Sequence, residues 1–173
     1  MIFRKAAAAD IAAVSEIFEA IHTEEESGRT TIGWIRGVYP TRATAEAGLA
    51  RGDLFVLEDG GEIVGSAVIN QTQVDCYAGA AWRFAAPDEE VMVLHTLVIA
   101  PKAGGKGYGK QFVAFYEDYA HEHGCQYLRM DTNERNTNAR ALYKKLGYAE
   151  VDIVPCVFNA IPNVQLVLLE KRL

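Results

Sequence analysis

The segment VMVLHTLVIAP, residues 91–101, constrains the fold more than any other part of this sequence. It is apolar at almost every position, and such continuous runs are typical of strands that are covered on both faces of a sheet. A glycine-rich segment, GGKGYGKQ, follows it directly. Phe112, Phe115, Tyr116 and Tyr119 then recur at the spacing of one helix face. We therefore expect a buried strand that leads through a glycine loop into a helix.

Strand-like and helical patterns alternate along the rest of the chain. Further strands are predicted at IFRKA, LFVLED, EIVGSAVIN, CQYLRMDTN, VDIVPCVF and VQLVLLEKRL, with a hairpin turn at Asp59-Gly60-Gly61. Further helices are predicted after an N-cap at Asp10, from Thr41 to Gly52, and from Asn136 to Gly147. Half of the 173 residues are apolar, and no repeat or linker interrupts them. These features predict one mixed α/β domain over residues 1–173.

The charge and the cysteine content restrict the partners and the compartment. A formal net charge of −6 argues against nucleic acid, because affinity for a polyanion depends on lysine and arginine. Cys76, Cys125 and Cys156 have no CxxC spacing, so we expect free thiols in the cytoplasm and no zinc site. His121 and His123 point apart on a helix, which disfavours a metal site there. No apolar run approaches the roughly 18 residues that a membrane helix needs.

The glycine segment has the composition of a phosphate-binding loop, and three kinds of such loop can be compared with it. A dinucleotide fingerprint would need glycine where Phe112 stands. A P-loop places Gly104, Gly109 and Lys110 in register, but Gln111 has no hydroxyl group for Mg²⁺. The third interpretation is a pyrophosphate loop, in which glycine backbone N–H groups and a helix N-terminus bind the anion.

Two segments together resemble the GCN5-related N-acetyltransferase (GNAT) family. LVIAPKAGGKGYGKQF resembles its pyrophosphate loop: Gly107 and Gly109 occupy the two small positions, whereas Gly104 replaces the usual Gln or Arg. NTNARALYKKLGY resembles the helix that follows one strand later. The matching residues of that helix are Asn136, Ala139, Leu142, Tyr143, Lys145, Gly147 and Tyr148. The resemblance is specific over roughly residues 91 to 150.

The resemblance implies a fold and a cosubstrate. The fold is a centrally splayed, mixed β-sheet flanked by helices in the order βααβββαβαββ, with acetyl-CoA bound in the splay and no metal. The backbone of Leu97, Val98 and Ile99 would pair with the pantetheine arm. The residues implied to hold the pyrophosphate are Gly104, Gly105, Lys106, Gly107, Tyr108, Gly109 and Lys110. The residues implied to complete the binding site are Asn136, Ala139 and Tyr143.

Acetyl transfer to an amine needs an oxyanion donor, an acid and a base. The resemblance implies that the backbone amide of Leu97 is the oxyanion donor and that Tyr143 protonates the coenzyme A sulfur. His95 is the candidate base, because it is titratable within an otherwise apolar strand. VLHTLVI also resembles the strand of arylalkylamine acetyltransferases in which a histidine assists proton removal. Glu90, Asp131 or water are the alternatives.

The acceptor remains open at this point. Trp34, Tyr39, Asp75, Tyr77 and Trp82 occupy regions that form the acceptor pocket in related folds, and aromatic rings with carboxylates suit an amine cation. A small amine, an amino acid, an aminoglycoside or a peptide N-terminus would each fit. The family also contains many homodimers. Two other functions compete with an N-acetyltransferase: a non-catalytic acyl-CoA-binding module and a P-loop nucleotide-binding protein.

Overall fold

All residues of the chain, 1–173, are described by a computed structural model. Strands and α-helices follow each other in the predicted order, βααβββαβαββ. The helices are α1 (Ile11–Glu26), α2 (Arg42–Arg51), α3 (Tyr108–Glu122) and α4 (Thr137–Lys145). The strands are β1 (Ile2–Lys5), β2 (Leu54–Asp59), β3 (Glu62–Asn70), β4 (Val91–Ile99), β5 (Tyr127–Asn133), β6 (Ala149–Phe158) and β7 (Ile161–Arg172). No helix has the length and hydropathy that crossing a membrane requires.

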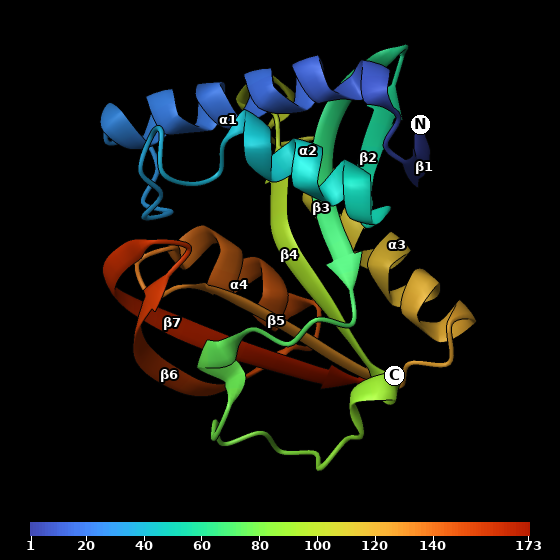
Figure 1. The fold of residues 1–173 in the computed structure, drawn as a ribbon, viewed down its shortest axis with the longest axis vertical. Coiled ribbons are helices and arrows are strands. Elements are labelled where there is room, and N and C mark those ends of the chain that lie inside the picture. Colours follow the sequence, from blue (N-terminus) through green and yellow to red (C-terminus); the bar gives the residue numbers. More distant parts are fainter.

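The strands form one open sheet in the order β1-β2-β3-β4-β5-β7-β6 (Figure 1). All neighbours are antiparallel except β4 and β5, which are parallel. These two strands pair only where Val91–Leu94 faces Tyr127–Met130. Beyond that segment they diverge, and Figure 1 shows β4 and β5 running apart from a common end near the C-terminus. The predicted splay at the centre of the sheet is therefore confirmed.

Different helices cover the two faces of the first half of the sheet. Helix α2 approaches β2 and β3 closely, because a Cβ added at Gly48 would lie 3.2 Å from Leu54 and 3.4 Å from Val68. On α3, the ring of Phe115 packs on Phe55 with 5.6 Å between centroids. Leu54 and Phe55 are consecutive, and successive side chains of a strand point to opposite faces. The part of the sheet formed by β2 and β3 thus lies between α2 and α3.

The first half of β4 has the burial that its apolar composition predicts. Val91 and Val93 are 0% exposed, and Met92 and Leu94 are 3% exposed. The two valines belong to one apolar cluster, and Met92 and Leu94 belong to another. Both faces of this segment are therefore packed, and the strand provides a rigid base for the residues that follow it.

Most of the predicted element boundaries are confirmed. Helix α2 begins after Thr41 and ends at Gly52, whose φ is 74°. Asn136 caps α4, and its Oδ1 accepts a hydrogen bond from the backbone N–H of Ala139 at 3.2 Å. Gly147 follows α4 with a φ of 88°, the left-handed conformation that glycine adopts most readily.

The predicted N-cap role of Asp10 is wrong. Asp10 precedes α1, but its carboxylate does not cap that helix. Its Oδ2 instead accepts hydrogen bonds from the backbone N–H of Ala7 and from Arg4, both at 2.7 Å. A short 3-10 turn, Ala8–Asp10, lies between β1 and α1. The guanidinium group of Arg4 competes successfully for the carboxylate and holds its pKa below the usual value.

Candidate active site

The divergence of β4 and β5 leaves one edge of β4 without a strand partner. β3 pairs with β4 as far as Ile99, whereas pairing with β5 ends at Leu94. The segment from His95 to Ile99 therefore exposes backbone groups toward the gap. Such an edge can bind an extended ligand as an additional strand. The predicted pantetheine-binding residues, Leu97, Val98 and Ile99, lie on this edge.

A β-bulge lies at the point where the strands diverge. Ser66 and Val68 of β3 are two positions apart, but their partners on β4, Val98 and His95, are three apart. Thr96 lies within this bulge with a φ of 51°, which is uncommon for a residue other than glycine. Because the bulge breaks the alternation of the strand, three consecutive residues of β4, His95 to Leu97, line the same cavity.

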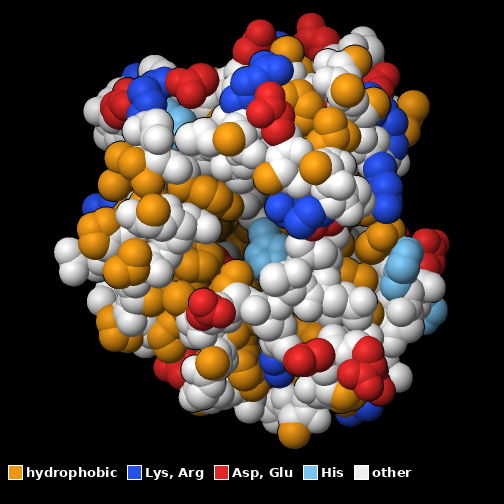
Figure 2. Space-filling model, in the orientation of Figure 1, with side chains coloured by type: hydrophobic (Ala, Val, Ile, Leu, Met, Phe, Trp, Pro, Cys, Tyr) orange, Lys and Arg blue, Asp and Glu red, His pale blue; other side chains and the backbone are white.

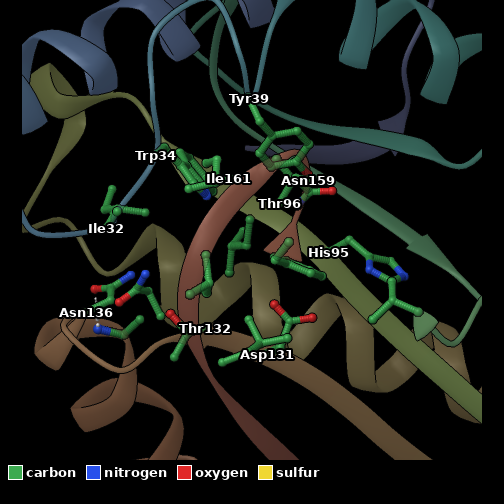
Figure 3. A pocket seen from close by; sticks show the side chains of 18 of the residues that line it. Ile32, Trp34, Tyr39, His95, Thr96, Asp131, Thr132, Asn136, Asn159 and Ile161 are labelled. Carbon is green, nitrogen blue, oxygen red and sulfur yellow. Dashed lines mark hydrogen bonds between the residues drawn. The ribbon is translucent and has the colours of Figure 1, made fainter. Parts of the chain in front are cut away.

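The gap contains a cavity of about 140 Å³. Figure 2 shows a hollow in the middle of this face, between the α1 and α2 part of the molecule and the β5 to β7 part, with hydrophobic side chains gathered along one side. The lining residues come from five parts of the chain: Ile32, Gly33, Trp34 and Tyr39; Val74; His95, Thr96 and Leu97; Asp131, Thr132, Asn133, Asn136, Ala139 and Tyr143; and Phe158, Asn159, Ile161, Val164 and Leu166 (Figure 3).

The structure divides the residues that were predicted to form the acceptor pocket. Trp34 and Tyr39 line the cavity, and the hydroxyl group of Tyr39 is hydrogen-bonded to Thr96. Tyr77 is buried outside the lining, where its ring packs on Trp82 with 5.1 Å between centroids. Trp82 also lies outside the lining, and its ring stacks on the buried guanidinium group of Arg129. Asp75 is exposed on the short 3-10 turn before Tyr77.

The wall formed by β6 and β7 was missed by the sequence analysis. Phe158 ends β6, and Ile161, Val164 and Leu166 lie on β7. A signal was present, because Val164 and Leu166 are apolar residues two positions apart with Gln165 between them. The pattern identifies a face of the strand, but it does not show that β7 lies between β5 and β6. That non-local arrangement is what directs the face to the cavity.

Tyr143 lies on α4 at the border of the cavity. Its side chain is buried, with 7% of the residue exposed, and its hydroxyl group forms no hydrogen bond with the rest of the protein. Burial raises the pKa of this phenol above its usual value, and the nearby carboxylate of Asp131 adds to the effect. The hydroxyl group therefore keeps its proton at neutral pH and is free to donate it.

Of the two carboxylates considered as bases, only Asp131 lines the cavity. Its Oδ2 accepts a hydrogen bond from the hydroxyl group of Tyr77 at 2.8 Å. Burial raises the pKa of Asp131 to about 7, partly opposed by the Tyr77 hydrogen bond, which lowers it. Glu90 lies outside the cavity, at the opposite end of β4 from the splay and roughly 16 Å along the strand from His95.

His95 is held in one neutral form by its neighbours. Asn70 donates its amide to Asp53 at 2.9 Å, so its Oδ1 faces the imidazole, with 3.1 Å to Nε2. Nε2 must therefore carry the proton, and Nδ1 carries the lone pair. Burial lowers the pKa of His95 to about 4. The imidazole is neutral at pH 7, but it binds an additional proton only weakly.

The glycine loop lies beyond Ile99, where β4 leads toward α3. Gly105 and Gly107 have φ values of 79° and 78°, and Gly107 is the N-cap of α3. A Cβ at Gly105 would meet no heavy atom within 4 Å, and one at Gly107 would meet only Gln111, at 3.8 Å. The loop therefore has open space in front of a helix N-terminus, the arrangement that suits an anion. Tyr108 anchors it, donating its hydroxyl to Asp59 at 2.5 Å.

Glycine stands at position 104, where the family pattern usually has Gln or Arg, and its backbone has an ordinary φ of −58°. A Cβ at this position would lie 3.2 Å from the carbonyl oxygen of Pro101, so a larger side chain would crowd the turn. Gly109 has room by comparison, with an added Cβ in ordinary contact with Leu142 at 3.4 Å. Lys106 reaches over Tyr108, with 6.0 Å between its amine and the ring centroid.

The site therefore combines three elements along one line of β4. A cavity with a proton donor and a carboxylate lies at His95, an unpaired strand edge follows, and a glycine loop lies at the far end. The four steps along β4 from His95 to Ile99 span at most about 13 Å. This geometry suits a long ligand with an anionic end in the loop and a reactive end in the cavity.

Comparisons with known proteins agree with this geometry. A family model, Acetyltransferase (GNAT) family, matches residues 14–148. The uncharacterized N-acetyltransferase YhfO of Bacillus subtilis is 27% identical over 97 residues, which cover 56% of this chain and 58% of the relative. The match thus spans less than two thirds of that relative's length.

Solved structures share the fold over nearly the whole chain. A GNAT-family acetyltransferase from Streptococcus agalactiae superimposes with a TM-score of 0.81 at 20% identity, covering 99% of this chain and 95% of that one. Salmonella typhimurium yncA, solved with its cofactor acetyl-CoA, superimposes with a TM-score of 0.68 at 21% identity, covering 99% and 93%. Together with the family model, which covers most of the chain including the glycine loop and α4, these findings show that this protein belongs to the acetyltransferase (GNAT) family.

Proposed function

We propose that this acetyltransferase transfers the acetyl group of acetyl-CoA to a primary amine, by direct attack while both substrates are bound. The observation that carries the proposal is that a protonated phenol, Tyr143, and a carboxylate, Asp131, line one cavity beside the unpaired edge of β4. The family membership argues against the P-loop alternative, because the matching acetyltransferase model includes the glycine loop.

The residues along β4 fit acetyl-CoA. The backbone of Leu97, Val98 and Ile99 is free to pair with an extended pantetheine arm. The N–H groups of Gly104 to Lys110 lie at the N-terminus of α3, where they suit the pyrophosphate. A structural relative, yncA, contains acetyl-CoA. Bound acetyl-CoA supplies an activated acetyl thioester for transfer.

Two groups of this chain would assist the departing thiolate and the developing oxyanion. Tyr143 remains protonated because burial raises its pKa, and its hydroxyl is not committed to another protein group. It can therefore protonate the sulfur as the thiolate leaves. Leu97 lies at the bulge and lines the cavity, which supports its backbone N–H as the donor to the carbonyl oxygen.

We propose Asp131 as the proton acceptor in place of His95. An effective base has a pKa near the working pH, and burial brings that of Asp131 to about 7. Burial lowers the pKa of His95 to about 4, so an imidazole that accepted the proton would hold it poorly. His95 instead contributes a neutral polar wall, fixed by Asn70.

The glycine loop gives a first testable prediction. Gly107→Val is expected to weaken acetyl-CoA binding tenfold or more, because the side chain would occupy the open space in front of α3. Lys106→Ala removes one charge-assisted contact and should cost about 1 to 2 kcal/mol. Isothermal titration calorimetry with acetyl-CoA measures both affinities.

Gly124→Val is the matched control for backbone strain. Gly124 follows α3 with a φ of 75° and open surroundings, so valine there meets the same conformational penalty far from the loop. We expect its acetyl-CoA affinity to stay within about twofold of wild type, since it removes no contact with the anion. Wild-type affinity in a folded Gly107→Val protein would refute the location of the pyrophosphate site.

A thiol-release assay with acetyl-CoA and a panel of primary amines tests the proposed function. Amine-dependent release of coenzyme A is the expected result. Acetyl-CoA binding without release for any amine would favour the non-catalytic acyl-CoA-binding module. Calorimetric binding of Mg-ATP without binding of acetyl-CoA would restore the P-loop interpretation of Gly104, Gly109 and Lys110.

A further inference from the structure

The cavity is lined by a negatively charged side chain and by no positively charged one. Asp131 is the only acidic side chain among its lining residues, and no lysine or arginine lines it. Figure 3 shows the Asp131 carboxylate on one side of the cavity, with Tyr39, Thr96 and His95 on the others. A buried carboxylate is stabilised by a cation in contact with it. The cavity therefore favours a positively charged group and offers nothing to pair with an anion.

The two arginines near the rim are already paired. Arg135 approaches Gly33, but it faces the carboxylate of Glu25 at 3.9 Å. Arg51, which lies near His95, binds Asp53 through two hydrogen bonds of 2.8 and 3.1 Å. Drawing either guanidinium group toward a substrate anion would break its existing interaction. A substrate carboxylate beside the amine would therefore meet Asp131 without a compensating cation.

Hydrophobic residues make up 11 of the 19 lining residues, and the cavity is small. Ile32, Trp34 and Tyr39 line it together with residues of β6 and β7, and Figure 3 shows Ile161 of β7 beside Trp34. A cavity of about 150 Å³ lined by aliphatic and aromatic side chains holds one benzene molecule. The volume here, about 140 Å³, matches a substrate body of one ring or a short alkyl chain.

Three polar side chains of the cavity already take part in hydrogen bonds within the protein. The Oδ1 atoms of Asn133 and Asn136 each already accept a backbone N–H, at 3.0 and 3.2 Å. The hydroxyl group of Thr96 is hydrogen-bonded to Tyr39. A peptide acceptor would bring N–H groups into this space, and buried donors without partners are costly. These three side chains therefore offer little to a peptide N–H group, whereas the apolar side chains of the cavity suit hydrocarbon.

The aromatic wall is held in place from outside the cavity. The carboxylate of Glu25 accepts hydrogen bonds from the backbone N–H groups of Ile32 and Gly33, at 2.6 and 2.9 Å. At the other end of the same loop, Nε2 of His22 donates to the carbonyl oxygen of Pro40 at 2.9 Å. A wall anchored at both ends keeps the cavity small, which excludes bulky acceptors.

We propose that the acceptor is a small primary amine with an aromatic or alkyl body and with no carboxylate, phosphate or phosphinate group next to the amine. The inference rests on the proposed function and names the substrate class of that site. The ammonium group binds Asp131, and the hydrocarbon body packs against the apolar lining that includes Trp34 and Ile161. Free amino acids and peptide N-termini are poor acceptors.

Matched acceptors test the proposal in the thiol-release assay. 2-Phenylethylamine and phenylalanine share a ring and an amine but differ by the carboxylate, and phenylalaninamide replaces that charge with a neutral amide. We expect kcat/KM for 2-phenylethylamine to exceed that for phenylalanine by about 100-fold or more, with phenylalaninamide between them. Phenylalanine or an N-terminal phenylalanine peptide acetylated as well as 2-phenylethylamine would overturn the proposal.

A pair of variants tests the packing. Trp34→Ala should lower kcat/KM for 2-phenylethylamine about tenfold or more and leave that for ethylamine within about threefold, because ethylamine does not reach the aromatic wall. Ile35→Ala is the control, since Ile35 is the next residue of the loop and is 46% exposed. Equal losses for both amines in Trp34→Ala would count against the proposed contact.

The inference and the proposed function fail in different ways. If acetyl-CoA binds and amino acids, aminoglycosides or peptides release thiol while 2-phenylethylamine, benzylamine and hexylamine do not, the substrate class is wrong and the N-acetyltransferase function stands. If acetyl-CoA binds and no amine releases thiol, both are wrong. If acetyl-CoA does not bind, the proposed cosubstrate is wrong, and the inference falls with it.

Discussion

Replacing Tyr143 with phenylalanine is expected to lower kcat by roughly 10- to 10³-fold and to leave the affinity for acetyl-CoA almost unchanged. The substitution removes a proton donor and keeps the ring that packs in the border of the cavity. The hydroxyl group has no hydrogen-bond partner in the protein, so its removal leaves no buried group unsatisfied. Steady-state kinetics and calorimetry with acetyl-CoA separate the two effects.

Tyr148→Phe is the matched control. The ring of Tyr148 packs edge-on against Tyr143 with 6.2 Å between centroids, and its hydroxyl group donates to Glu117 at 3.0 Å. Glu117 also forms a partly buried ion pair with Lys171, and Tyr148 does not line the cavity. We expect a kcat close to wild type. If Tyr143→Phe and Tyr148→Phe behave alike, Tyr143 is a packing residue and the thiolate takes its proton from water.

Asp131→Asn is expected to lower kcat/KM by roughly 10²- to 10⁴-fold and to remove the acidic limb of its pH profile. In the wild type the carboxylate must be ionised to accept the proton of the amine. Its pKa of about 7 therefore predicts that kcat/KM rises with pH through that value. Asparagine has a similar shape and keeps an oxygen for the Tyr77 hydrogen bond, so the fold should be retained.

The same substitution should make the protein more stable at high pH. Burial raises the pKa of Asp131 above its value in the unfolded chain, so the folded protein holds the proton more tightly. The wild type therefore loses stability as pH rises from about 4 through about 7, and Asp131→Asn does not. Urea unfolding at pH 5 and pH 8 should show a larger advantage of the variant at pH 8.

His95→Gln distinguishes the two candidate bases. We expect it to retain the acidic limb near pH 7, because the pKa of His95 is lowered to about 4 and the limb belongs to Asp131. Loss of the limb in His95→Gln together with its retention in Asp131→Asn would assign the base role to the histidine. In the unfolding experiment, an equal difference in stability between the wild type and Asp131→Asn at pH 5 and pH 8 would show that the pKa of Asp131 is not raised.

The parts of the site that depend on local sequence were predictable. A loop that binds an anion through its backbone needs residues without side chains and a helix directly after it. The position of such a loop could therefore be predicted from Gly105 and Gly107 in the sequence alone. The helix containing Tyr143 has an N-cap at Asn136 and a left-handed glycine after its end, and both are short-range signals. The order of strands and helices followed from similar patterns.

The parts that depend on long-range packing were not predictable. His95 was expected to titrate near neutral pH, but its pKa depends on how deeply the fold buries it, and Asn70, the partner that fixes its tautomer, is contributed by β3. The raised pKa of Asp131 has the same origin. The wall of β7 and the placement of Trp34 require contacts between segments more than a hundred residues apart, which no local pattern encodes.

The bulge at Thr96 divides β4 into two parts that are under different structural constraints. Before it, every side chain is packed on one face or the other, so variation there is limited by folding. After it, the alternation of faces starts again, and one edge of the strand is left without a strand partner. Substitutions at residues 95 to 97 would therefore alter the lining of the cavity without disturbing the packing of residues 91 to 94. Deleting one residue at the bulge would couple the two parts and exchange the faces of everything that follows.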